Sequence, residues 1–270
     1  MRNVNYYLRI TCLPAGTARY ALLYSLILFL CFSVNVAFAA DKFSFAVFGD
    51  NRDGDKVFTD LINKLNQDPS LAFAVNTGDF VSYGREAEYQ NYIKMVKSLK
   101  IKIYNLPGNH DLVAGGYKNY LKYIGPYYFS IDYLNSHFIF INNAFKESFD
   151  AAQFNWLKND LENTKQEHVF VFMHRPTFDP SDIYGGYIMS GRKVVEELIR
   201  LFERDKVDYV FAGHIHGYAK AKRGRVTYIV TAGAGAPLYL PREFGGFYHY
   251  VKITVDGDRI MDEVKMIYGE

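Results

Sequence analysis

Short apolar runs alternate with amphipathic stretches over most of the chain. Residues 43–48, 71–76 and 101–106 are apolar runs of strand length, and a polar loop follows each of them. Residues 56–67 and 86–99 carry apolar side chains at the spacing of a helix. Strand, loop and helix in regular alternation are typical of a parallel sheet with helices packed on it, so the pattern predicts an α/β fold.

The remainder of the chain continues this pattern after a predicted β-hairpin. The runs 127–133 and 137–142 flank the short segment Leu134-Asn135-Ser136, which predicts two antiparallel strands. No Pro-, Gly- or Ser-rich linker, repeat or low-complexity tract divides the sequence after residue 39. We therefore expect one domain over residues 40–270, with mixed sheets covered by helices. The other predicted elements are a strand at 168–173, a helix at 192–204, a strand at 207–212 and closing strands at 225–230, 248–255 and 259–267.

A further helix is predicted over residues 151–163. Asp150 and Gln153 have the spacing of a capping box at its start. Its apolar side chains recur at helical spacing and share one face, which is expected to pack on a sheet. These side chains are Phe154, Leu157 and Leu161.

The first 39 residues predict a signal peptide. An apolar run at 21–34 follows basic residues and precedes Ala37-Phe38-Ala39, a small-x-small site of the kind that signal peptidase cuts. Cleavage there would make the protein periplasmic or secreted, whereas an uncleaved segment would anchor it to a membrane. Both cysteines, Cys12 and Cys31, lie in this segment, so the rest of the chain offers no thiolate ligand and no disulfide.

The charge balance argues against nucleic acid as a partner. The formal net charge is +2, but three arginines fall within the first 40 residues, where there is no acidic residue. Without them, 28 basic residues face 29 acidic ones. A domain with nearly equal numbers of basic and acidic residues lacks the basic surface that nucleic acids or anionic membranes attract, so no nucleic-acid partner is predicted.

Candidate metal ligands follow five of the predicted strands. Open α/β sheets bind ligands at the carboxyl ends of their strands, so these segments should converge. Together they supply carboxylates, an amide and imidazoles, a set of oxygen and nitrogen donors that suits Mn, Fe or Zn. The segments are Gly49-Asp50-Asn51-Arg52, Gly78-Asp79, Gly108-Asn109-His110-Asp111, His174-Arg175-Pro176 and Gly213-His214-Ile215-His216.

Three local patterns add detail to this site. In an extended chain, His214 and His216 would point the same way roughly 6–7 Å apart, so each could hold one of two neighbouring ions. Asp79 follows a strand flanked by two others and could bridge both ions. His110 directly before Asp111 suggests an imidazole oriented by a carboxylate, as a general acid requires.

Taken in order, these motifs resemble those of the calcineurin-like metallophosphoesterase family. The resemblance implies a four-layer α/β/β/α sandwich with a dinuclear centre of divalent transition metals. It implies a first ligand set, consisting of Asp50, Asp79 and His216, and a second ligand set, consisting of Asp79, Asn109, His174 and His214. It also implies that His110 contacts the phosphate and protonates the leaving group.

Arg52 is the one departure from the family pattern, which usually has a histidine ligand of the first ion at that position. Arginine stays protonated and cannot ligate a metal, so the first site lacks an imidazole ligand and is expected to bind its ion more weakly, with a lower catalytic rate. One hypothesis places its guanidinium in the pocket, where it grips a phosphate oxygen. The alternative turns it to solvent or pairs it with Asp53 or Asp55.

The favoured function is that of a phosphomonoesterase acting on a small phosphorylated substrate through a metal-bridging hydroxide. A phosphodiesterase or pyrophosphatase on the same centre is one alternative, and a metal-binding protein with weak catalysis because of Arg52 is another. Loops 176–191 and 232–246 are predicted pocket walls. A structural role is predicted for histidines outside the motifs, and Tyr83 is predicted to be a pocket or core aromatic rather than a ligand. These histidines are His137, His168 and His249.

Overall fold

The computed structural model describes residues 42–183, 185–239 and 241–269. The predicted signal peptide at 1–39, with both cysteines, lies outside the described residues. Within the described ranges, no helix has the length and apolar character needed to cross a membrane.

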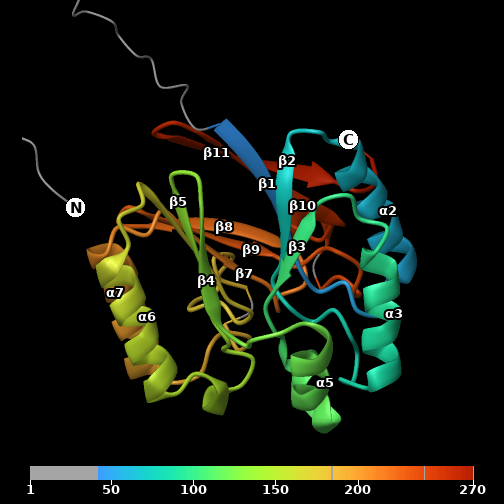
Figure 1. The fold of residues 1–270 in the computed structure, drawn as a ribbon, viewed down its shortest axis with the longest axis horizontal. Coiled ribbons are helices and arrows are strands. Elements are labelled where there is room, and N and C mark those ends of the chain that lie inside the picture. Colours follow the sequence, from blue (N-terminus) through green and yellow to red (C-terminus); the bar gives the residue numbers. More distant parts are fainter. Residues whose placement is uncertain (1–41, 184, 240, 270) are drawn as a thin grey trace, which may run out of the picture. The chain divides into compact units, whose positions relative to one another are not determined.

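One sheet has the strand order β11-β10-β1-β2-β3 (Figure 1). Strands β1, β2 and β3 run parallel, as the alternation of strands and helices predicts, and β10 joins β1 in antiparallel fashion. Every described position of β1 after the first is buried, which explains its continuous apolar run. The bounds are β1 Lys42–Phe48, β2 Leu71–Asn76, β3 Lys102–Asn105, β10 His249–Asp256 and β11 Arg259–Met266.

The other sheet has the order β4-β5-β6-β7-β9-β8. The predicted hairpin is present, with Tyr133 paired to Ser136 across a two-residue turn. Strands β5, β6, β7 and β9 run parallel to one another, whereas β4 and β8, at the two edges, are antiparallel to them. The bounds are β4 Phe129–Tyr133, β5 Ser136–Phe140, β6 His168–Phe172, β7 Tyr209–Ala212, β8 Tyr218–Arg223 and β9 Val226–Thr231.

The two sheets face each other across an aromatic core. Phe45 of β1 makes edge-to-face contacts with Phe138 of β5 and Phe170 of β6, at ring-centroid distances of 5.2 Å each. Such contacts stabilise beyond the area that they bury. Adjacent residues of β1 point the other way, so Ala46 and Phe48 belong to the core beneath the helices of the first sheet. The inner surfaces of both sheets are therefore apolar and buried.

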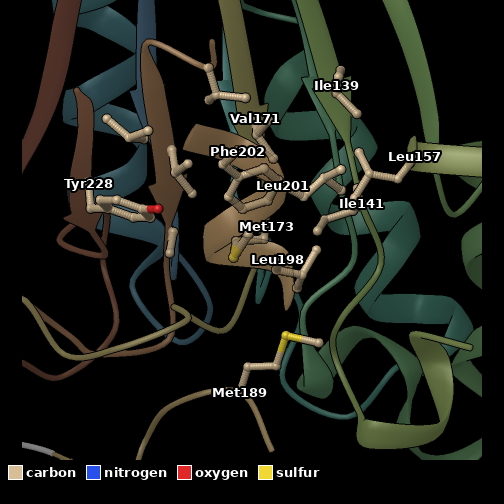
Figure 2. Close-up of a cluster of buried hydrophobic side chains, with 14 of the residues drawn as sticks. Ile139, Ile141, Leu157, Val171, Met173, Met189, Leu198, Leu201, Phe202 and Tyr228 are labelled. Carbon is tan, nitrogen blue, oxygen red and sulfur yellow. The ribbon is translucent and has the colours of Figure 1, made fainter. Parts of the chain in front are cut away.

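Helices cover the outer face of each sheet (Figure 1). Helix α7 packs Leu198, Leu201 and Phe202 against the second sheet, where they meet Val171 and Met173 (Figure 2). The result is the four-layer α/β/β/α sandwich, as the family resemblance implied. On the first sheet the helices are α2 Asp55–Gln67, α3 Glu86–Val96 and α5 Gly116–Tyr123, and on the second they are α6 Ala151–Asn163 and α7 Arg192–Arg204.

The structure contains elements that the sequence pattern does not predict, and it corrects a predicted contact at the start of α6. Helix α5 and strand β8 are present without having been predicted, because both are short and carry many exposed polar side chains. At the start of α6, Asp150 accepts the backbone N–H of Gln153, as predicted. The Gln153 side chain does not complete the capping box. It bonds instead to the backbone of Asn142, two residues after β5, and thereby ties the helix to the sheet.

Candidate metal centre

The loops after β2, β6 and β7 bring three ligand atoms together. One side-chain atom each from Asp79, His174 and His214 lies within 4.8 Å of the others, and all three residues are buried. Asn109, the first residue of the short helix α4 Asn109–Leu112, places its Oδ1 3.1 Å from His174 Nε2. The structure therefore assembles the second ligand set around one point.

His174 is oriented for ligation through one ring nitrogen. Its Nδ1 lies 2.9 Å from the carbonyl oxygen of Thr77, which can only accept, so Nδ1 carries a proton. Nε2 then points into the centre, 3.5 Å from Asp79 Oδ1. Burial lowers the pKa of His174, but the Asp79 carboxylate outweighs burial and raises this pKa to about 9. A metal ion would take the place of the Nε2 proton beside the Asp79 carboxylate.

His214 is held in the neutral form that a metal requires. Burial, followed by the charges of His174 and Arg175, lowers the pKa of His214 to about 2. Its Nε2 is buried and has no hydrogen-bond partner among the described residues. Such an orphaned nitrogen is costly in a protein interior unless something binds it. The second ligand set thus fits a divalent ion in donor type and burial.

The backbone at His214 departs from the expected extended chain. His214 has a φ of 68°, in the left-handed region, and its N–H donates to Asp50 Oδ2 at 3.0 Å. His214 Nδ1 lies 3.1 Å from His174 Nε2, whereas His216 Nε2 lies 3.3 Å from Asp50 Oδ1. The two imidazoles therefore belong to different ligand sets, as expected. The backbone that separates them is left-handed at His214 and not extended.

The first ligand set is also brought together. His216 Nδ1 donates to the carbonyl of Pro237 at 2.7 Å, which leaves Nε2 facing Asp50. Asp50 Oδ1 is buried and makes no hydrogen bond to a described residue. Asp79 lies between the two sets, next to Gly108, where any added Cβ would collide with the Asp79 carboxylate. This close approach requires glycine at position 108.

Arg52 lies at the edge of the first ligand set. Its side chain is only 15% exposed, so it does not turn outward to solvent. Nη1 pairs with Asp53 Oδ2 at 2.6 Å, and Nε lies 3.8 Å from Asp79 Oδ2. The pairing with Asp53 agrees with one of the two alternatives for Arg52, while the Nε edge of the guanidinium faces Asp79.

The expected contact between His110 and Asp111 is wrong. Both residues belong to the helical turn α4, in which successive side chains point in different directions. His110 Nδ1 instead bonds to the carbonyl of Ser82 at 2.8 Å. The fully buried Asp111 carboxylate accepts four backbone N–H groups at 2.7–3.0 Å. Asp111 therefore orders the loop that carries Asp79 and does not orient an imidazole.

Arg175 is a second cation at the centre, to which the sequence patterns assigned no role. Its Nη2 lies 3.4 Å from Asn109 Oδ1, and its Nε donates to the carbonyl of Ala144 at 2.8 Å. Burial lowers the pKa of Arg175, yet an arginine so placed stays charged. The signal for it was its position next to His174 after a buried strand.

Two tyrosines, which belong to the loops predicted as pocket walls, place their rings next to the ligand imidazoles. The ring of Tyr239 stacks on that of His216, with centroids 4.1 Å apart. The ring of Tyr187 lies 5.9 Å from that of His214 and 5.6 Å from that of Tyr239. Both tyrosines are about two-fifths exposed, so their rings form an aromatic wall beside the centre.

The remaining candidates lie outside both ligand sets. His137 bonds to Asp132 and Asp160 through its two ring nitrogens. His168 and His249 each bond to a backbone carbonyl, of Gly257 and Phe247 respectively. Tyr83 is 54% exposed and lies beneath the guanidinium of Arg85 rather than among the ligands or in the core.

Comparison with known proteins defines the family. The calcineurin-like phosphoesterase family model matches residues 43–218, so the chain belongs to this family and is a metal-dependent hydrolase. Serine/threonine-protein phosphatase CPPED1 of Danio rerio is 29% identical over an alignment of 218 residues, and the match covers 72% of this chain and 67% of that relative.

Solved structures share the fold at low sequence identity. Purple acid phosphatase PPD1 from yellow lupin (Lupinus luteus) aligns with a TM-score of 0.71 at 15% identity, over 84% of this chain and 52% of its own. A dimetal phosphatase from Danio rerio aligns with a TM-score of 0.66 at 14% identity, over 84% of this chain and 96% of its own. This chain thus spans about half of the lupin protein.

Proposed function

We propose that this chain hydrolyses phosphomonoesters of small molecules with the help of Mn, Fe or Zn. The observation that carries the proposal is the buried second ligand set, in which His214 Nδ1 lies 3.1 Å from His174 Nε2 among oxygen and nitrogen donors. A metal there would supply positive charge to phosphoryl oxygens and make water a stronger nucleophile. Phosphatase relatives support the same reaction class.

The groups around the centre suit a dianionic phosphate. Arg175 lies beside Asn109 on the side of the second ligand set, and Arg52 lies beside Asp79 on the side of the first. Two guanidinium groups offer fixed donors to phosphoryl oxygens and favour the more highly charged monoester over a diester. The Asn109 amide would hold a further oxygen.

His110 is positioned to protonate the leaving group. Its Nδ1 donates to the Ser82 carbonyl, so Nε2 is the ring nitrogen left for substrate. Only the doubly protonated ring can then transfer a proton from Nε2 to the departing ester oxygen. Its backbone N–H donates to Asp79 Oδ1 at 2.8 Å, which ties the acid to the ligand sets.

Comparing p-nitrophenyl phosphate with its bis ester and with pyrophosphate tests this proposal. With Mn, Fe or Zn added, the monoester should have a higher kcat/KM than the bis ester, because both arginines then meet a dianion instead of a monoanion. Preference for the bis ester would indicate a phosphodiesterase, and preference for pyrophosphate a pyrophosphatase. Metal binding without turnover of any of the three would support the metal-binding protein with weak catalysis.

We also propose that residues 1–39 direct the domain to the periplasm or the exterior. The support is the apolar run followed by Ala37-Phe38-Ala39. Expression of the full chain followed by N-terminal sequencing of the exported protein should give a chain that begins at Ala40. Recovery of an intact N-terminus in the membrane fraction would instead show an uncleaved anchor.

A further inference from the structure

We propose that Arg52 replaces the first metal ion, so that this chain holds a single ion in the second ligand set. The guanidinium would supply the positive charge that a second ion supplies in a dinuclear centre. This inference rests on the proposed metal dependence and concerns how many ions carry it out. It is a departure from the dinuclear centre that the family resemblance implied.

The position of Arg52 carries the argument. Nε lies 3.8 Å from Asp79 Oδ2, the oxygen that a shared carboxylate would offer to the first ion. The other carboxylate oxygen, Oδ1, faces His174 Nε2 at 3.5 Å. Asp79 therefore spans a guanidinium on one side and the second ligand set on the other. A cation already occupies the side where a first ion would bind.

Local contacts hold the guanidinium in this place. Nη1 pairs with Asp53 Oδ2, and the other Asp53 oxygen accepts the hydroxyl proton of Ser82. The backbone N–H of Arg52 donates to the carbonyl of Asp79 at 3.1 Å. Ser82 and Asp79 belong to the same loop. The Arg52 side chain, through Asp53, and the Arg52 backbone are therefore both tied to the loop that carries the Asp79 carboxylate.

The donor count favours the second ligand set over the first. Apart from Asp79, the first ligand set contains Asp50 and His216, whereas the second contains Asn109, His174 and His214. Arginine has no lone pair to donate and repels a divalent ion placed next to it.

Counting the ions bound per chain tests the inference without any assay of activity. The full chain would be loaded with Mn²⁺, desalted, and measured by elemental analysis and by electron paramagnetic resonance. The wild type should bind one ion and give the spectrum of an uncoupled Mn²⁺. Arg52→His, which restores an imidazole and removes the cation, should bind two ions and show an exchange-coupled pair. Arg204→Gln, at an exposed ion pair, is the control and should match the wild type.

Two further variants separate this inference from the metal assignment itself. His216→Ala should leave the metal content unchanged, because the first ligand set holds no ion. His174→Ala should lose the ion, and retention of metal in that variant would contradict the proposed second site rather than the role of Arg52. Two ions in the wild type, or the loss of half the metal in His216→Ala, would overturn the inference.

Discussion

Replacing Asp111 by Asn should destabilise the protein far more than its near-identical shape suggests. The wild-type carboxylate accepts two backbone N–H groups on each oxygen, from Asp79 and Gly108 on Oδ2 and from Phe80 and Val81 on Oδ1. An amide has one accepting oxygen, and its NH₂ group would face two N–H donors. At about 1.5–3 kcal/mol for each hydrogen bond to a charged group, losing two predicts about 3–6 kcal/mol.

Urea unfolding of the metal-free proteins measures this difference. Asp150→Asn is a matched control, because Asp150 accepts one N–H at a helix N-cap, where Asn serves about as well. We expect the control to lie close to the wild type and Asp111→Asn to unfold at much lower urea. A loss below about 1 kcal/mol in Asp111→Asn would refute the view that this carboxylate orders the Asp79 loop.

Three other predictions concern catalysis, pH and specificity. His110→Gln should slow esters with poor leaving groups about 10²–10⁴-fold more than activated aryl esters, and equal slowing would exclude a general acid. Burial lowers the pKa of His137, but Asp160 and Asp132 outweigh it and raise this pKa. The stability that His137 contributes is therefore present below its unfolded pKa of about 6.5 and is lost as pH rises through the folded value. The loss of unfolding free energy in His137→Gln should be larger at pH 6 than at pH 9, and equal losses would contradict this sign. Tyr239→Leu should reduce kcat/KM for phenyl phosphate about 2–10-fold while sparing an alkyl phosphate, and equal effects on both would argue against ring stacking.

Much of the site could be predicted because parallel strands end at the same edge. The runs that became β1, β2, β6 and β7 were recognisable by their apolar composition, and within each sheet the residues after neighbouring parallel strands converge. His174 and His214 meet for this reason, whereas Asp79 comes from the first sheet and joins them because the two sheets pack face to face. The hairpin was equally accessible, since its strands and short turn are contiguous in the chain.

The finer geometry depended on contacts that no local pattern records. Asp50, Asp79 and His214 all adopt a left-handed backbone, which side-chain type alone does not indicate. Two of the N–H groups that donate to Asp111 belong to a loop about 30 residues earlier in the chain. Likewise, the placement of Arg52 is decided by Asp53 together with Ser82 from a different loop. Contacts between segments far apart in the chain therefore decide which partner each of these side chains has, and local sequence patterns do not record such contacts.

The most direct test of the metal-dependent phosphatase is a joint measurement of metal content and p-nitrophenyl phosphate hydrolysis in wild type and His174→Ala. His168→Gln, which alters an imidazole outside both ligand sets, serves as the control. The account predicts that the wild type and the control retain metal and activity, whereas His174→Ala loses its ion and about a hundredfold or more of its rate. Equal metal content and equal rates in all three proteins, or full wild-type activity in the presence of a chelator, would contradict it.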